Sequence, residues 1–198
     1  MKFFETSQYF SLKKSTYINL RSIAIIGQLI TINLIYFIFN LEFDLTLGNL
    51  TILIGILSNL YLLYVNKNTQ LSDKSAFLFL LIDIFQLSCL IYLTGGIINP
   101  FSIFLIFPTI FSSSNLGFKC NFLLASFTVL IIIFLTFFSQ PLPYPVNEHF
   151  HVDGYYYYSI PISLIIALIF LDYFAITFGK ESRIRKEALN KMEEIMSK

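Results

Sequence analysis

The sequence predicts an all-α integral membrane protein: a six-helix transmembrane bundle followed by a C-terminal cytoplasmic helix. Three observations support this class. Of the 198 residues, 56% are hydrophobic and only 13% are charged, and the mean hydropathy is +0.73, outside the range of soluble domains. Apolar runs long enough to cross about 30 Å of hydrocarbon recur along the chain. Lysine and arginine residues are also distributed asymmetrically between those runs.

The six apolar runs cover residues 22–39, 46–65, 77–93, 101–118, 122–138 and 156–178. The fourth run is the least regular, because it contains Pro108 and ends in the polar stretch Ser-Ser-Ser-Asn. Proline within a helix removes a backbone hydrogen bond and clashes with the preceding turn. We therefore expect the fourth helix to be kinked or short.

The positive charges test the number of spans independently, because they collect in cytoplasmic segments of membrane proteins. With six spans and a cytoplasmic N-terminus, all 13 lysine and arginine residues lie on the cytoplasmic side, Arg21 among them. The outer segments contain only acidic residues and histidines as ionisable groups, apart from tyrosine. A count of five spans would destroy this alternation, so both termini are predicted to be cytoplasmic.

Three regions follow from this topology: a cytoplasmic lead-in (1–21), the transmembrane domain (22–178) and a cytoplasmic helical linker (179–198). In the linker, four apolar residues recur at helical spacing and share one face. They are Ile184, Ala188, Met192 and Ile195. Two interpretations stay open: a helix lying on the membrane surface, or the start of a parallel coiled coil in a homodimer.

The stretch "GGIINPF" (residues 95–101) separates the third and fourth runs. Gly95 and Gly96 can end a helix, since glycine adopts the left-handed conformation that follows many helices. Asn99 is a favoured residue for the position before a helix, and Pro100 suits the first helical position. These residues predict a tight turn on the outer side of the membrane.

The same stretch is also suited to holding a ligand. Adjacent glycines leave space beside the backbone, and free amide N–H groups at a helix start favour a carbonyl or anionic oxygen. Asn99 offers a hydrogen-bond donor and Phe101 a ring that can stack on a flat molecule. A membrane quinone has these properties, so the turn and the ligand site both remain open.

Polar residues within the third run extend this prediction. Asp83 and Gln86 share a helix face, and Thr94 continues it towards the glycines. Exposing polar side chains to the hydrocarbon of the bilayer costs free energy, so within a span they usually face the interior of a helix bundle or a cavity. The alternative is an interhelical hydrogen bond from this face to Gln28 or Asn33.

Other reactive side chains give no sign of catalysis or of a metal site. His149 and His151 lie in an outer loop that is expected to be solvated, and two histidines do not define a metal site. Cys89 and Cys120 are expected to differ in depth by about 18 Å, too far for a disulfide. Asp172, near the inner end of the sixth run, is expected at a solvated interface.

"GGIINPF" matches a GGxxNPF heptapeptide, "LLIDIFQLSCLIYLT" resembles the span that leads into it, and "LRSIAIIGQ" is similar to the start of a first span. The family with these features is the RegB/PrrB family of redox-responsive sensor histidine kinases. The resemblance covers essentially the whole chain. It implies that Gly95, Gly96, Asn99, Pro100 and Phe101 contact ubiquinone or a related membrane quinone, which favours the ligand interpretation.

The resemblance further implies a homodimer in the bacterial inner membrane, a cytoplasmic kinase module and a response regulator as partners. A histidine kinase requires a phosphoacceptor histidine on a cytoplasmic helix and an ATP-binding domain, and neither occurs before Lys198. We therefore expect this chain to be inactive by itself, as a truncated sensor region or as a naturally short relative.

The main rival is a six-helix small-molecule carrier, such as the substrate-binding subunit of a vitamin transporter, which has a similar length and topology. The two functions predict different C-terminal segments. A continuous helix leading from the sixth run into the linker indicates signal output, whereas a carrier has little use for one.

Overall fold

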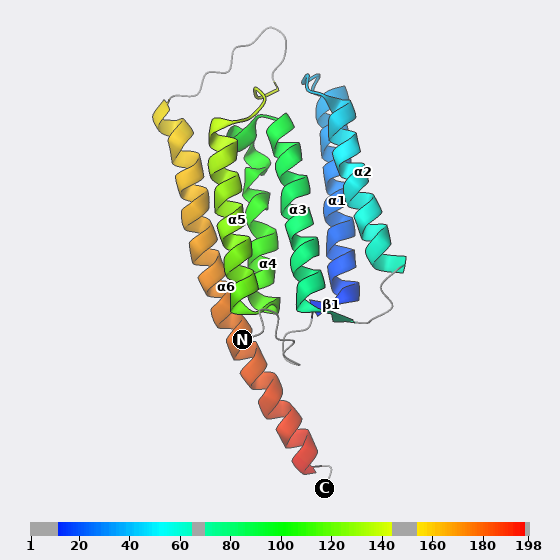
Figure 1. Cartoon of the computed structure of the whole chain (residues 1–198), viewed down its shortest axis with the longest axis vertical. Helices are drawn as coiled ribbons and strands as arrows, with labels where there is room; N and C mark the ends of the chain where they lie inside the picture. Colours follow the sequence, from blue (N-terminus) through cyan, green and yellow to red (C-terminus); the bar gives the residue numbers. More distant parts are fainter. Residues whose placement is uncertain (1–11, 65–69, 144–153, 197–198) are drawn as a thin grey trace.

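The computed structural model describes residues 12–64, 70–143 and 154–196. In chain order the elements are β1 (Leu12–Lys13), α1 (Lys14–Phe37), α2 (Leu45–Tyr64), β2 (Gln70–Leu71), α3 (Asp73–Leu93), the 3₁₀ helices η1 (Gly96–Ile98) and η2 (Pro100–Ile106), α4 (Phe107–Asn115), α5 (Phe118–Phe137) and α6 (Gly154–Met196). Figure 1 shows α1 to α5 side by side, with α6 along the α5 edge of the bundle and extending beyond it.

Five helices are long and apolar enough to cross a membrane. They are Lys14–Phe37, Leu45–Tyr64, Asp73–Leu93, Phe118–Phe137 and the Gly154–Gly179 part of α6. They correspond to the first, second, third, fifth and sixth predicted runs, so the prediction of a multi-pass helical membrane protein is confirmed for these segments.

The fourth predicted run is a discontinuous helix. It begins as the 3₁₀ helix η2 and changes to α-helix at Phe107, with Pro108 in the first turn of α4. Proline is accommodated there because the first helical residues need no N–H partner within the helix. The shortened, irregular fourth span expected from Pro108 is therefore present, as two stacked pieces in place of one kinked helix.

The N-terminal part of the bundle differs from the prediction. Helix α1 begins at Lys14, before the apolar run that starts at residue 22, so Arg21 lies inside a helix. Leu12 and Lys13 pair in antiparallel fashion with Leu71 and Gln70, just ahead of α3. The regular structure of the described residues is thus all-helical apart from this short pairing. The sequence did not predict the pairing, because no alternating pattern marks these residues.

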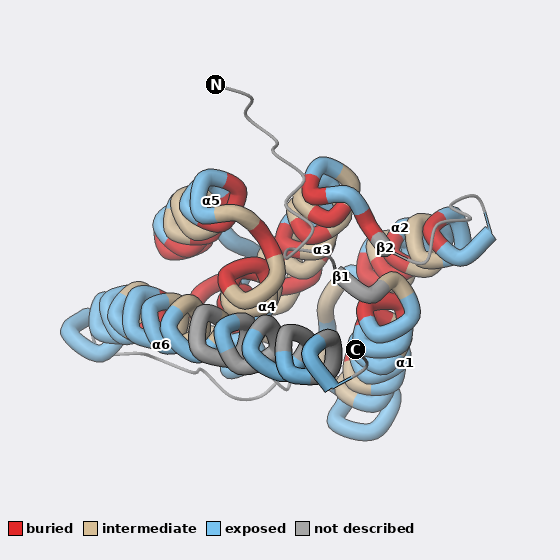
Figure 2. The backbone as a smooth tube through the Cα atoms, turned by 90° about the horizontal axis from the view of Figure 1, so that it is seen from below, coloured by how far each residue is buried: buried red, intermediate tan, exposed pale blue. Residues whose placement is uncertain are grey.

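The surface is apolar on the outside, as expected for helices surrounded by lipid. Many large hydrophobic side chains are exposed, such as Ile23, Leu130 and Phe170. Figure 2 shows buried residues where helices face one another and exposed residues on the outward sides. The helices therefore bury only a narrow strip of each surface against their neighbours.

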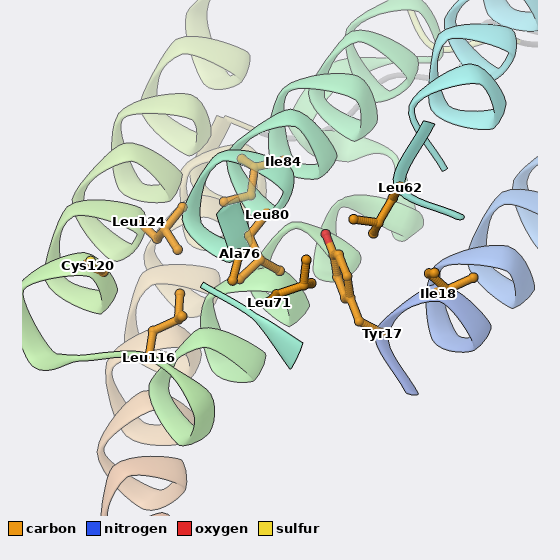
Figure 3. Packing of buried hydrophobic residues seen from close by; sticks show 10 residues of the cluster. All are labelled: Tyr17, Ile18, Leu62, Leu71, Ala76, Leu80, Ile84, Leu116, Cys120 and Leu124. Carbon is orange, nitrogen blue, oxygen red and sulfur yellow. The ribbon is translucent and has the colours of Figure 1, made fainter. Parts of the chain in front are cut away.

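Helix α3 lies between the α1–α2 pair and the α4–α5 pair, and its buried residues hold the two pairs together. One apolar cluster, drawn in Figure 3, contains Tyr17, Ile18, Leu62, Leu71, Ala76, Leu80, Ile84, Leu116, Cys120 and Leu124. A second cluster lies nearer the "GGIINPF" loop and contains Ile91, Ile97, Leu105, Ile132, Leu135 and Leu164. Both cysteines are free thiols, as predicted.

Helix α6 continues without a break from the bundle to Met196, despite Pro161 near its start. Its final part extends past the end of the other helices (Figure 1). The predicted apolar face at Ile184, Ala188, Met192 and Ile195 is exposed along its whole length. No other part of the described chain covers this face.

Candidate functional site

Two glycines form the turn that ends α3. Thr94 caps the helix, and its N–H donates to the Ile91 carbonyl at 3.1 Å. Gly95 and Gly96 follow with φ values of 108° and 60°, in the region that L side chains rarely adopt. The sequence prediction that these glycines terminate the third helix is confirmed.

The glycines also allow the segment after α5 to pack directly against the loop. A Cβ atom at Gly95 would meet Leu142, including its Cα at 2.9 Å, and one at Gly96 would meet Ser139 and the Leu135 carbonyl oxygen. The Gln140 N–H donates to the Tyr92 carbonyl at 2.9 Å and holds this segment in place. The space beside the glycines is therefore occupied by the protein's own chain.

This packing leads to a stability prediction. We expect Gly96→Ala to destabilise the protein by about 2–4 kcal/mol, because it combines a strained backbone with a steric clash. Gly27→Ala is the matched control, since a Cβ atom there has no neighbour within 4 Å; it should leave stability unchanged or raise it by up to about 1 kcal/mol. Thermal unfolding in detergent measures both, and equal melting temperatures would contradict the packing described.

Asn99 fastens the loop through three hydrogen bonds. Its Nδ2 donates to the Thr94 carbonyl at 2.9 Å and to Thr94 Oγ1 at 2.6 Å, and its Oδ1 accepts from the Phe101 N–H at 2.8 Å. It caps η2, with Pro100 following at the helix start, so the predicted helix start is confirmed. Because both amide hydrogens are used within the loop, Asn99 positions the loop and presents no free donor to solvent.

Phe101 begins an aromatic stripe that runs along η2 to the first residue of α4 and consists of Phe101, Phe104 and Phe107. Successive ring centroids lie 5.9 and 5.4 Å apart in stacked geometry, and all three rings are partly exposed. A 3₁₀ helix has three residues per turn, so residues three apart lie directly above one another. The stripe gives the loop an accessible flat surface. Sequence reasoning identified Phe101 but missed Phe104 and Phe107. In an α-helix, residues three apart drift by about 60° around the axis at each step, so all three rings stand in line only where the helix is 3₁₀.

Asp83 and Gln86 belong to a different site from the loop. Asp83 forms an ion pair with Arg21, with 2.6 Å between its Oδ1 and Arg21 Nε, and accepts from the Tyr17 hydroxyl at 2.6 Å. Gln86 donates to Gln28 at 2.9 Å, so the alternative of an interhelical hydrogen bond is confirmed. Of the predicted polar face, Thr94 alone bonds to the loop, since Asp83 is about 18 Å away from Gly95 along the helix axis.

The burial of Arg21 is a feature that the sequence analysis did not identify. Arg21 was counted among the cytoplasmic charges, and the structure shows that it is only 5% exposed. Its Nη2 donates to Ser58 of α2 at 2.6 Å, and its guanidinium lies against the rings of Tyr17 and Phe79. Arg21 thus joins α1, α2 and α3. The available signal was a pair of opposite charges in two apolar runs, Arg21 early in the first and Asp83 within the third.

A second polar network joins α4, α5 and α6. Thr109 and Thr128 share a hydrogen bond of 2.8 Å, and Ser112 donates to Asn121. Asn121 in turn donates to Asp172 Oδ2 at 2.8 Å. Asp172 is itself partly exposed, so its expected position at a solvated interface stays a prediction.

Within the ranges that the structure describes, no group of three or more His, Cys, Asp or Glu side chains is placed to hold a metal ion. His149 and His151 lie outside those ranges, so their predicted solvation is untested.

Comparison with known proteins gives the family. The family model described as a PilS-like transmembrane domain matches residues 12–183, which is most of the chain. The chain belongs to the PilS-like transmembrane domain family. The family model describes six transmembrane segments. This number agrees with the five long helices together with the discontinuous helix formed by η2 and α4.

The sensor histidine kinase RegB of Cereibacter sphaeroides is 26% identical over 175 residues, which cover 88% of this chain and 38% of that protein. The resemblance to RegB-type sensors is therefore confirmed at the level of distant homology. This PilS-like domain spans about two fifths of its relative's length. No solved structure matches it.

Proposed function

We propose that this PilS-like domain is the quinone-sensing, redox-responsive input domain of a two-component sensor histidine kinase. The observation that carries the proposal is the arrangement around α6. The "GGIINPF" loop leads directly into η2 and α4, α4 packs against α6, and α6 leaves the bundle as one unbroken helix. A ligand at the loop is thus connected to an output helix, which favours a sensor over the rival carrier.

The loop is suited to a quinone for reasons of shape and polarity. The aromatic stripe offers stacking surface to a flat ring approaching from the lipid, where a membrane quinone resides. Asn99 holds the backbone of Phe101 rigidly, so a stacked ring would act on η2 and not only on one side chain. In this proposal Gly95, Gly96 and Pro100 shape the loop, and Phe101 makes the contact.

Signalling requires that oxidised and reduced quinone bind two arrangements of the bundle with different affinity, because equal binding shifts no equilibrium. The change would pass from η2 to α4 and then, through Asn121 and Asp172, to α6. We further propose that the exposed apolar face of the α6 extension pairs with a second copy of the chain. Both termini would be cytoplasmic in the bacterial inner membrane, with a kinase module downstream acting on a response regulator.

A chimera tests this function. The chain is fused through α6 to a histidine kinase module and reconstituted with ubiquinone or ubiquinol, and autophosphorylation is measured. We expect the rate to depend on the quinone's redox state. Inserting two residues after Gly179 should abolish that dependence, because it rotates the extension by about 200° relative to the bundle.

A seven-residue insertion at the same position is the matched control, since it nearly restores the helical face. It should keep the redox response. Kinase activity that is indifferent to the quinone's redox state in the uninterrupted chimera would contradict the proposed function.

A further inference from the structure

The outer ends of α5 and α6 are fastened to each other beside η1, which contacts both helices. Carbonyl groups in the last turn of a helix have no partner within that helix. At the end of α5, the Thr136 carbonyl accepts a hydrogen bond from the hydroxyl of Tyr157, in the first turn of α6. The Tyr92 carbonyl at the end of α3 accepts from the Gln140 N–H at 2.9 Å. The first turn of α6 is therefore anchored to the end of α5, and the chain that follows α5 is anchored to α3.

The 3₁₀ helix η1 packs against α6 at the same end of the bundle. Its Ile97 side chain is only 1% exposed and shares the second apolar cluster with Leu164 of α6. Three further α6 side chains pack against this cluster: Tyr157, Ile160 and Ile165. The "GGIINPF" loop therefore contacts α6 directly, in addition to its connection with α4 through η2.

A proline lies in the middle of this contact. Pro161 is buried inside α6, with Tyr157 and Ile160 before it in the chain and Leu164 after it. Because Pro161 has no N–H, the Tyr157 carbonyl has no helical partner, and the proline ring crowds the preceding turn. Sharp bends in helices occur mostly at such positions. The cluster around Ile97 thus touches α6 on both sides of the point where the helix bends most easily.

We propose that Pro161 is a hinge and that the packing of Ile97 across it sets the bend of α6. This inference rests on the proposed quinone-sensing function and names the contact by which the loop acts on the output helix. Oxidised and reduced quinone would hold η1 in different positions, and each position fits a different angle between the two parts of α6. This route reaches α6 without passing through α4.

The length of α6 makes a small bend effective. The helix continues from Pro161 to Met196, which is about 50 Å. A change of about 5° at the hinge therefore moves the end of the helix by about 4 Å when the part after Pro161 stays straight. The hydrogen bond of Tyr157 keeps the first turn in place during this movement, so the change in angle is carried by the long part of the helix.

The test uses the chimera of the full chain with a histidine kinase module, together with titration of the same protein with short-chain ubiquinone in nanodiscs. Pro161→Ala restores the missing backbone hydrogen bond and stiffens α6. We expect this variant to bind ubiquinone as the unaltered chimera does, but to autophosphorylate at equal rates with ubiquinone and ubiquinol. Ile162→Ala is the matched control, because Ile162 is the next residue and is exposed, and the substitution leaves the backbone hydrogen bonds in place. It should keep the redox response.

Ile97→Val, which removes one methyl group from the contact with α6, should bind ubiquinone but respond more weakly to its redox state. A full redox response in either the Pro161 or the Ile97 variant would overturn the hinge and leave the proposed function intact. Loss of ubiquinone binding in Pro161→Ala would also overturn it, because Pro161 would then shape the ligand site. An unaltered chimera that ignores the quinone's redox state would contradict the proposed function itself, and the hinge with it.

Discussion

Asp83→Asn is expected to destabilise the bundle by about 3–5 kcal/mol, the largest stability effect of any single substitution considered. The substitution keeps the shape of the side chain but removes its charge, so Arg21 becomes a buried cation without a counter-charge. Arg21 is only 5% exposed and cannot reach solvent without leaving α2 and α3. Chemical or thermal unfolding in detergent measures the loss.

Two comparisons make this prediction specific. Asp44→Asn is the matched control, because Asp44 caps α2 by accepting from the Leu47 N–H, and asparagine caps a helix equally well. The double variant Arg21→Met with Asp83→Leu should recover most of the lost stability, since it removes both charges together. If the Asp83→Asn and Asp44→Asn proteins have the same melting temperature, the ion pair contributes little to the stability of the bundle.

Much of the fold followed from local patterns. The apolar runs located the five long helices because lipid selects for length and hydrophobicity, which are properties of each segment alone. Gly95, Gly96, Asn99 and Pro100 defined the turn for the same reason, since caps depend on residues a few positions apart. Pro108 likewise predicted an irregular fourth span.

The features that the sequence analysis missed depend on contacts between residues far apart in the sequence. Arg21 was counted as one more cytoplasmic charge, because a count of positive residues uses their positions along the chain and carries no information about their contacts. Its partner Asp83 lies 62 residues away, and Asn121 lies 51 residues from Asp172. The aromatic stripe was missed because Phe101 and Phe107 would diverge by about 120° around an α-helix. They stand in line in a 3₁₀ helix, which the apolar pattern of residues 101–107 does not distinguish from an α-helix.

Quinone binding is expected to weaken about tenfold in Phe101→Ala, since the ring that would stack on the ligand is lost. The measurement is titration of the purified protein in nanodiscs with a short-chain ubiquinone. Phe118→Ala is the matched control, because Phe118 is also exposed and also stacks on a phenylalanine, Phe122, but lies at the other end of the bundle. The Phe118→Ala protein should bind the quinone with the same affinity as the unaltered protein.

The most direct test of the quinone site uses the absence of tryptophan from the chain. Phe101→Trp places a single tryptophan at the loop, and Phe118→Trp places one at the opposite end, both in nanodiscs of the same lipid. If the quinone binds at "GGIINPF", added ubiquinone should quench the indole at position 101 saturably and at low occupancy, while the indole at 118 is quenched only in proportion to the quinone dissolved in the lipid. Identical, unsaturable quenching at both positions would contradict a quinone site at this loop.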